Sequence, residues 1–233
     1  PTWFDLTTRY GEDFYLPRVK WLPDNTMVIQ IQNREQTEVE LVRLYPSDGS
    51  SSSILVEHND AWVNLHNMFT PLKKAEQFVW ASERSGMQHL YLYDYDGTLV
   101  RTLTEGDWMV EDIKAVDEGT GLVYFVGTKD GWLERHLYSV PLAGGPVVKI
   151  TREPGMHNVI IDHKREYFVD QFSSAKLPFR VNVCSLADGS TLRPLYANDD
   201  ARLQRLQLSP PEFFTTSSTD GAVVLQGSVL RPD

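Results

Sequence analysis

Residues 89–100 read HLYLYDYDGTLV and have the pattern of two short strands joined by a tight turn. Leu90 and Leu92 alternate with tyrosines at a period of two, which is the spacing of side chains on one face of a strand. Asp96-Gly97 favours the positive φ angles of a hairpin turn, and the alternation resumes at Leu99. This stretch therefore predicts the outer half of a four-stranded antiparallel unit.

The same strand-turn-strand pattern occurs at three other places along the chain. Its first strand begins at Leu41, Leu90, Leu137 and Val181, so the intervals between copies are all in the forties. A repeat of this length is typical of a β-propeller blade, which has about four short strands. No window shows a sustained helical period, which excludes a solenoid of helical pairs. We therefore predict an all-β chain made of about four propeller blades.

The repeat also predicts where each blade begins. The first complete blade is expected over about residues 15–56, and the next three are expected to begin at Trp62, at Trp108 and near Met156. Residues 1–14 are expected to belong to the end of a preceding blade. The second strand of every blade is an apolar run, as expected for strands that are buried on both faces.

The repeat ends after Asn198, and the last part of the chain has a different pattern. Residues 209–211 read SPP, which cannot lie in a central strand and is typical of a linker. The runs 212–216 and 222–230 then flank an Asp-Gly pair, which predicts a separate hairpin. A new domain is therefore expected to begin near residue 210.

The composition indicates an acidic globular protein. The 233 residues include 22 Lys and Arg against 32 Asp and Glu, a formal net charge of −10, and no basic cluster occurs. Nucleic-acid binding is therefore not expected, because it needs a basic surface. Cys184 is the single cysteine, so no disulfide can form within the chain, which fits a reducing compartment.

No apolar run of membrane-spanning length and no signal peptide is visible in the sequence, so no membrane segment is expected in this chain. The chain begins with Pro1 rather than Met, and we expect that it is a piece of a longer protein. Any targeting signal would then lie outside it.

Catalytic and metal-binding motifs are missing from the sequence. No G-x-S-x-G pentad occurs, so the nucleophile of an α/β-hydrolase is not expected in this chain. The six histidines form no H-x-x-x-H or H-x-H pair, so a structural zinc site is not expected. His89 and His136 occupy equivalent positions before the repeated strand, which predicts a structural role. The Asp94-x-Asp96-Gly97 sequence lacks the later glutamate of a calcium loop, which favours a hairpin turn.

A propeller can also bring a glycosidase-like pair of carboxylates together from different blades. The acidic residues available for such a pair are Asp60, Glu83, Asp107, Glu111 and Asp130. The sequence alone does not bring any two of them together, and most acidic residues are solvated loop charges. A propeller glycosidase or lactonase therefore stays open as one alternative.

Four stretches of the chain resemble a known family of enzymes. They are DAWVNLH at 60–66, FVWASERSGMQHLY at 78–91, TEGDWMV at 104–110 and LVYFVGTKD at 122–130. Together they resemble the propeller of dipeptidyl peptidase IV-type enzymes, which are prolyl oligopeptidase-like serine peptidases. The stretch from Gly127 to Tyr138 is most similar to the cytosolic members, of the dipeptidyl peptidase eight and nine type. The resemblance covers nearly the whole chain.

The resemblance implies an eight-bladed propeller followed by an α/β-hydrolase domain that removes Xaa-Pro or Xaa-Ala dipeptides from N-termini. Residues 1–209 would be the second half of that propeller, and residues 210–233 would be the linker and first hairpin of the hydrolase domain. The family's Ser-Asp-His triad lies beyond this point and its paired glutamates lie in an earlier blade. No catalytic residue is therefore expected in this chain, which should be inactive alone.

The resemblance also implies partners and a location. The substrates would be peptides with a free N-terminus, and the propeller would gate and shape the cavity in which its own hydrolase domain acts. The full-length protein would be a cytoplasmic homodimer that needs no cofactor or metal. An alternative from another class is a non-enzymatic propeller that scaffolds protein partners through its loops.

One contact of the family can be carried over to this sequence. The family commonly has an aromatic-arginine pair after the glycine that matches Gly86, and this pair reaches toward the extended substrate-binding pocket. Here the pair is Met87-Gln88, which has neither the ring nor the guanidinium. Stacking and charge are therefore lost, and the resemblance implies a changed or weakened outer subsite at Met87 and Gln88.

Overall fold

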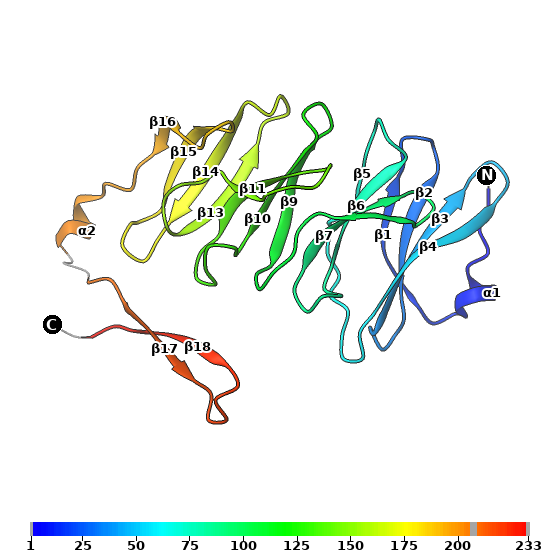
Figure 1. Ribbon diagram of the computed structural model, residues 1–233, viewed down its shortest axis with the longest axis horizontal. Helices are drawn as coiled ribbons and strands as arrows, with labels where there is room; N and C mark the ends of the chain where they lie inside the picture. Colours follow the sequence, from blue (N-terminus) through cyan, green and yellow to red (C-terminus); the bar gives the residue numbers. More distant parts are fainter. Residues whose placement is uncertain (1, 206–208, 232–233) are drawn as a thin grey trace. The chain divides into compact units, whose positions relative to one another are not determined.

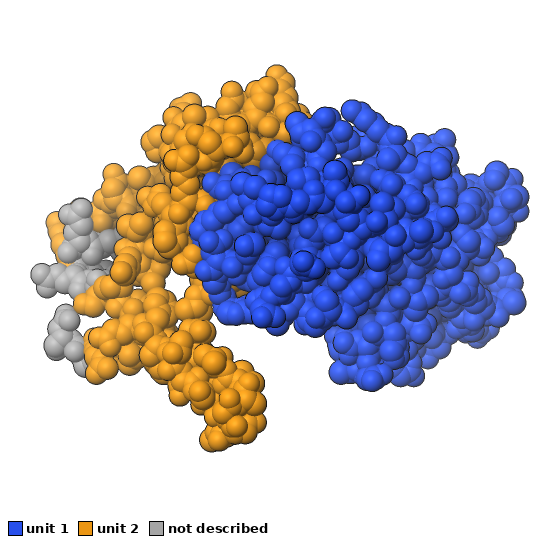
Figure 2. Space-filling model, viewed as in Figure 1, with its two compact units in different colours: residues 1–132, 136–150 blue, residues 133–135, 151–233 orange. Residues whose placement is uncertain are grey.

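The computed structural model describes residues 2–205 and 209–231 and is almost entirely β-structure (Figure 1). The chain divides into two compact units, which Figure 2 colours separately. The first unit comprises residues 1–132 and 136–150, and the second comprises residues 133–135 and 151–233. The predicted all-β class is confirmed.

The first unit contains three antiparallel sheets of four strands in its described part. The first sheet pairs β1 (Tyr15–Trp21), β2 (Met27–Gln32), β3 (Glu38–Tyr45) and β4 (Ser50–His58) in that order. The second sheet pairs β5 (Thr70–Pro71), β6 (Gln77–Ser82), β7 (His89–Asp94) and β8 (Leu99–Thr102). The third sheet pairs β9 (Val110–Asp117), β10 (Leu122–Gly127), β11 (His136–Pro141) and β12 (Val148–Lys149). Strands adjacent in sequence are adjacent in each sheet, as in propeller blades.

The second unit contains a fourth sheet of the same kind and a separate hairpin. The fourth sheet pairs β13 (Met156–Ile161), β14 (Tyr167–Ser173), β15 (Arg180–Ser185) and β16 (Thr191–Tyr196) in that order. The short helix α2 (Ala201–Arg205) follows it. The predicted hairpin is confirmed as β17 (Glu212–Ser217) and β18 (Val224–Val229), in which Phe214 lies opposite Gly227.

The repeated turn forms as the sequence predicts. In the second sheet β7 pairs with β8 so that Tyr93 lies opposite Leu99. Gly97 has a φ of 91°, which confirms the positive φ that was expected from the Asp-Gly pair. The equivalent residues Gly49 and Gly189 have φ of 79° and 70°. The same positive-φ conformation therefore recurs at the glycine of each of these three turns.

The apolar runs form strands that are buried on both faces. β2, β6 and β10 are buried at every position after their first residue, as predicted. The prediction is wrong for β14, in which buried positions alternate with more exposed ones, as in a strand with one buried face. One core cluster joins the first and second sheets and includes Leu41 and Phe78. Another joins the second and third sheets and includes Val79 and Phe125. Burial of these side chains between neighbouring sheets is the main force that holds the first unit together.

Two predicted blade starts are wrong. Trp62 lies in a loop, and the second sheet begins only at Thr70. The Oδ1 atom of Asn59 accepts a hydrogen bond from the backbone N–H of Trp62 at 3.2 Å and from that of its predecessor at 2.9 Å, which bends the chain into a turn. Trp108 also precedes its strand, and its ring stacks on Phe125 with 5.9 Å between the centroids. Both tryptophans therefore mark loops before a sheet.

The segment before β1 packs on the first sheet, and its assignment to the end of a preceding blade stays a prediction. It contains the short helix α1 (Thr7–Tyr10), and its apolar side chains pack against a cluster on the first sheet that includes Ile29 and Val42. The carboxylate of Glu40, on β3, accepts hydrogen bonds from Arg9 at 2.5 Å and from the Tyr10 hydroxyl at 2.8 Å. Apolar contacts and one buried carboxylate thus hold this segment on the first sheet.

Candidate functional site

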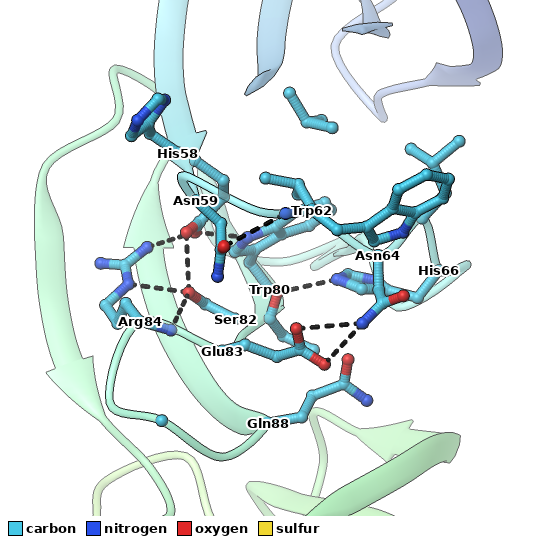
Figure 3. Close-up of a pocket in the computed structure, with 16 residues that line it drawn as sticks. His58, Asn59, Trp62, Asn64, His66, Trp80, Ser82, Glu83, Arg84 and Gln88 are labelled. Carbon is cyan, nitrogen blue, oxygen red and sulfur yellow. Dashed lines mark hydrogen bonds and ion pairs between the residues drawn. The ribbon is translucent and has the colours of Figure 1, made fainter. Parts of the chain in front are cut away.

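A cavity of about 300 Å³ lies in the first unit between the first and second sheets. Its walls come from the end of β4, from the loop 59–66, and from the end of β6 with residues 83–88 after it (Figure 3). These are two of the stretches on which the family resemblance rests. We call this space the Trp62 cavity.

The loop 59–66 forms one wall of the Trp62 cavity. The Asn59 turn fixes its beginning, and the backbone N–H of Val63 donates to the carbonyl oxygen of Gln36 at 2.9 Å. The loop is thereby attached to the turn between β2 and β3. Trp62 stays 52% exposed, so its indole offers an apolar surface at the cavity wall.

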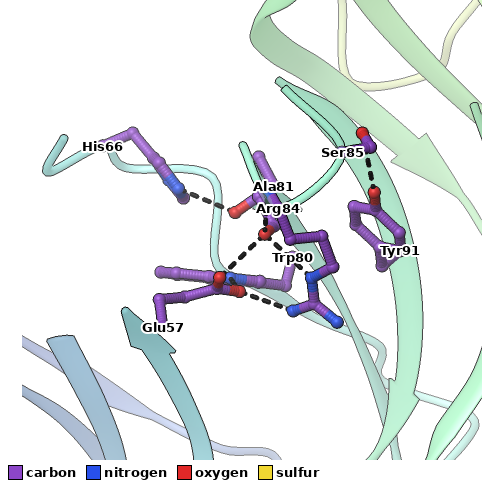
Figure 4. Close-up of polar contacts among 8 residues, drawn as sticks. Glu57, His66, Trp80, Ala81, Arg84, Ser85 and Tyr91 are labelled. Atoms are coloured by element: carbon purple, nitrogen blue, oxygen red, sulfur yellow. Dashed lines mark hydrogen bonds and ion pairs between the residues drawn. The ribbon is translucent and has the colours of Figure 1, made fainter. Parts of the chain in front are cut away.

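A polar cluster around Glu57 joins the two sheets beside the cavity (Figure 4). The Glu57 carboxylate accepts hydrogen bonds from the Trp80 indole at 3.0 Å, from the Ser82 hydroxyl at 2.8 Å and from the Arg84 guanidinium at 2.5 Å. The Arg84 guanidinium lies 4.6 Å from the ring centroid of Tyr91. Burial opposes the charge on Arg84, but the hydrogen bond and the negative charge of Glu57 outweigh it and raise the Arg84 pKa.

Glu83 is the other carboxylate of the cavity, and its surroundings differ from those of Glu57. Both of its carboxylate oxygens lie 3.1 Å from the Nδ2 atom of Asn64, which donates to them (Figure 3). Glu57 has Arg84 as its ion-pair partner, whereas Glu83 has no ion pair among the residues that the structure describes. Glu83 is therefore the carboxylate in this cavity that retains an uncompensated negative charge.

His66 contributes a neutral ring to the same wall. Its Nε2–H donates to the carbonyl oxygen of Ala81 at 2.9 Å, and its Nδ1 accepts from the backbone N–H of Met68 at 3.2 Å. Its ring lies 4.4 Å from that of Trp80. Burial lowers the His66 pKa to about 4, so the ring is neutral at pH 7. With both nitrogens engaged, His66 is not available as a general base.

The two substrate-binding residues predicted from the sequence take different positions. Gln88 is buried and lines the Trp62 cavity, and its Nε2 donates to the backbone carbonyl of Val110 at 2.7 Å. Met87 is partly buried and does not line this cavity. The assignment of Met87 and Gln88 to an outer subsite therefore stays a prediction.

Trp62, His66 and Glu83 were not identified as site residues from the sequence. The sequence predicts that Trp62 begins a strand, and it offers Glu83 as one of several carboxylates with no assigned partner. The available signal was Asn59, which directly precedes the DAWVNLH stretch and favours a turn at its start. The cavity supplies an exposed indole, a negative charge and a neutral imidazole, which can hold a group but provide no activated nucleophile.

Two of the other candidate carboxylates, Asp60 and Asp130, have separate partners. Asp60 pairs with His58 at 3.1 Å. Asp130 accepts a hydrogen bond from the Tyr138 hydroxyl at 2.6 Å and pairs with Lys149 at 3.3 Å. Over residues 2–205 and 209–231, no group of three His, Cys, Asp or Glu side chains is arranged to hold a metal ion. In the same ranges, neither helix has the length and apolar character needed to cross a bilayer.

The repeated four-stranded antiparallel sheets, with a cavity between the first two, are the features of a propeller region. Comparison with known proteins assigns it to a family. The family model "Dipeptidyl peptidase IV (DPP IV) N-terminal region" matches residues 2–179. The chain therefore belongs to the dipeptidyl peptidase IV N-terminal family, and the resemblance found in the sequence is confirmed.

Individual relatives agree with this assignment. Dipeptidyl peptidase 8 of Mus musculus is 26% identical over 279 residues, covering 94% of this chain and 31% of the relative. Dipeptidyl peptidase 4 of Arthroderma otae is 27% identical over 206 residues, covering 84% of this chain and 26% of the relative. The crystal structure of Porphyromonas gingivalis dipeptidyl peptidase 4 is similar with a TM-score of 0.84 and 25% identity, over 94% of this chain and 31% of that one. The chain thus spans less than a third of these relatives.

Proposed function

We propose that this chain is the propeller portion of a serine dipeptidyl aminopeptidase that releases Xaa-Pro or Xaa-Ala dipeptides from peptides with a free N-terminus. The observation that carries the proposal is the family match over residues 2–179, which includes both stretches that build the Trp62 cavity. In this role the propeller gates access and shapes the substrate cavity. The Ser-Asp-His triad lies in the remainder of the protein, so the chain alone is inactive.

The domain boundary predicted from the sequence is part of this proposal. Residues 1–209 would be the propeller portion, and residues 210–233 the linker and first hairpin of the α/β-hydrolase domain. The described hairpin β17–β18 supports this, because it leaves Phe213 and Val224 exposed, at 55% and 67%. A two-stranded hairpin with exposed apolar side chains is not stable by itself, and a further layer of the hydrolase domain would cover it.

The Trp62 cavity would be an outer subsite for the peptide substrate. Its exposed indole and the charge of Glu83 suit an apolar or cationic side chain, since both attract a cation. Gln88 stands at the wall of this cavity, and Met87 beside it, where the family commonly has an aromatic-arginine pair. Peptide preference would then depend on both residues. The proposed full-length protein is a cytoplasmic homodimer, by its resemblance to cytosolic members of the family.

The test is hydrolysis of Gly-Pro and Ala-Pro chromogenic dipeptides by the full-length protein, with this chain assayed in parallel. We expect turnover by the full-length protein and none by the chain alone. Turnover by neither would contradict the peptidase proposal and favour a propeller that scaffolds protein partners. In the full-length protein, Met87→Phe and Gln88→Arg are expected to change the preference among longer peptides, and an unchanged preference would contradict the subsite assignment.

A further inference from the structure

A cavity of about 240 Å³ lies in the second unit, on one face of the fourth sheet. Its lining includes Asp170 of β14, Asn182 of β15 and residues 189–191, where β15 turns into β16. The volume is far larger than the roughly 10–15 Å³ that one water needs, so a group of several heavy atoms can enter. We call this space the Asn182 cavity. It shares no lining residue with the Trp62 cavity.

Asn182 presents a side-chain amide to this cavity. The residue is 8% exposed, and within the described part of the chain its amide makes no hydrogen bond. Four polar side-chain atoms of the described residues are fully enclosed without a partner, and neither amide atom of Asn182 is among them. The amide therefore keeps accessible surface, and it faces the cavity that Asn182 lines. A ligand that supplies both a donor and an acceptor would satisfy it.

His157 and Asp170 form a buried pair in the wall beside this amide. The Nε2 atom of His157 lies 2.8 Å from the carbonyl oxygen of Glu153, and its Nδ1 lies 2.9 Å from the carboxylate of Asp170. Each of these two hydrogen bonds needs a proton, so His157 and Asp170 together carry no net charge. The pair is polar, but it does not attract an ion.

The other charged side chains of the lining are paired as well. The Arg152 guanidinium forms an ion pair with Asp188 at 3.4 Å and donates to the Asp188 carbonyl oxygen at 2.7 Å. The Glu153 carboxylate forms an ion pair with Arg180. An ionic ligand would therefore find no unpaired counter-charge in the Asn182 cavity, which favours a neutral polar ligand.

Two further groups of the lining can bond to a neutral ligand. Asp170 lies directly opposite Asn182 in the pairing of β14 with β15, and its carboxylate oxygens can each accept a further hydrogen bond. The hydroxyl of Thr191 lies 4.0 Å from the Cys184 thiol, which is a weak contact, so it can donate to a ligand. The amide of Asn182 thus has an acceptor and a donor as neighbours.

A carboxamide matches this set of groups. It carries N–H donors and a carbonyl acceptor side by side in one plane, which is the complement of the Asn182 amide. A nucleobase edge can offer a similar pair of atoms to an asparagine. However, Phe168, the aromatic residue of the lining, is only 1% exposed, so its ring gives no surface on which a base could stack.

We propose that the Asn182 cavity binds the carboxamide of a glutamine or asparagine side chain in a peptide. The N–H groups of the carboxamide donate to the Asn182 Oδ1 and to the Asp170 carboxylate, and its oxygen accepts from the Asn182 Nδ2 and the Thr191 hydroxyl. A free amino acid would bring an ammonium and a carboxylate that find no counter-charge here, which favours a peptide side chain. The site is separate from the proposed peptidase subsite.

The probe is glutamine with an acetylated N-terminus and a methylamide C-terminus, whose binding to the full-length protein is followed by saturation-transfer NMR. The blocked ends remove the free N-terminus, so binding does not depend on peptidase activity. We expect the glutamate and methionine analogues of the probe each to bind about tenfold more weakly or worse, because each leaves a hydrogen bond of the Asn182 amide unmade. Free glutamine is expected to bind more weakly too.

Variants of the full-length protein test the residues. Asn182→Leu should weaken binding about tenfold or more without lowering the midpoint of urea unfolding, because the amide has no partner in the free protein. Thr191→Val, at an exposed position, should also weaken binding and does not depend on a change in the buried face. Asn158→Leu is the matched control, because Asn158 is exposed on β13 and does not line the cavity. It is expected to keep the affinity.

Several results would overturn the proposal. They are absence of binding by the probe, equal affinity for the glutamine, glutamate and methionine compounds, and unchanged affinity in both Asn182→Leu and Thr191→Val. Glucose that displaces the probe at equal affinity would identify a general site for hydroxyl groups and would also overturn it. Free glutamine that binds as tightly as the probe would overturn the assignment to a peptide side chain.

Discussion

The indole N–H of Trp80, in the second sheet, donates to the carboxylate of Glu57, in the first sheet, at 3.0 Å. The same carboxylate is 12% exposed and also accepts from Ser82 and Arg84. One acidic side chain therefore satisfies three donors of the neighbouring sheet. Since the Trp80 ring packs on His66, the position of Glu57 also sets one wall of the Trp62 cavity.

Replacement of Glu57 is expected to destabilise the first unit. Glu57→Ala leaves the Trp80 indole and the Ser82 hydroxyl without their acceptor, and it leaves Arg84 without its ion-pair partner. We expect a loss of about 2–4 kcal/mol in the free energy of unfolding, measured by urea denaturation. Glu57→Gln keeps the shape and one acceptor oxygen, so its loss should be smaller.

Glu35→Gln is the matched control, because Glu35 is exposed and lies in the turn between β2 and β3. We expect it to change stability by less than about 0.5 kcal/mol. Equal effects of Glu57→Gln and Glu35→Gln would show that the interactions of Glu57 contribute nothing to stability.

His66 is expected to make stability depend on pH. Burial holds its pKa at about 4 in the folded protein, whereas an unfolded histidine has a pKa of about 6.5. Between these values the unfolded chain binds a proton that the folded protein does not, so stability falls as pH falls from about 6.5 toward about 4. The limiting slope is about 1.4 kcal/mol per pH unit.

The measurement compares urea unfolding at several pH values for the natural sequence and for His66→Gln. The glutamine cannot titrate, so the part of the pH dependence that belongs to His66 should disappear in this variant. If His66→Gln retains the full slope, His66 is not the group that titrates.

The sequence predicts the sheets well because their signals are local. The alternation in residues 89–100 and its Asp-Gly turn are properties of neighbouring residues, and the structure confirms both. The structural role of His89 is confirmed too, since its Nδ1 lies 3.1 Å from the Thr104 hydroxyl and its Nε2 lies 2.9 Å from the carbonyl oxygen of Gly106.

The candidate site could not be predicted in the same way. Trp62 and Val63 lie in a segment that alternates like a strand, but the bonds to the Asn59 side chain and the bond from the Val63 N–H to the Gln36 carbonyl hold it as a loop. The hydrogen bond between Glu57 and Trp80 joins residues in different sheets, and no local sequence pattern predicts such a contact. The arrangement of neighbouring sheets, rather than the residues themselves, determines the Trp62 cavity.

Gln88 is expected to stabilise the folded protein, in addition to any contact that it makes with substrate. Gln88→Leu removes the hydrogen bond from its Nε2 to the buried carbonyl of Val110, and we expect a loss of about 1–2 kcal/mol in the free energy of unfolding. Met87→Leu changes a neighbouring side chain of similar volume and is expected to be nearly neutral. Urea denaturation of both variants checks this, and equal stabilities would contradict it.

Gly97 is expected to tolerate no side chain, because its turn lies against the backbone of the first sheet. A Cβ built on Gly97 would overlap the carbonyl oxygen of Ile54, whereas a Cβ on Gly86 would meet nothing within 4 Å. The two glycines have similar φ angles, 91° and 96°, so alanine meets similar backbone strain at each. Gly86→Ala should therefore cost only about 1–2 kcal/mol, and Gly97→Ala should cost clearly more because β4 must also move.

Unfolding midpoints in urea measure the difference between the two variants, which isolates the close approach of the β7–β8 turn to β4. Equal losses would mean that this approach contributes nothing beyond the backbone strain.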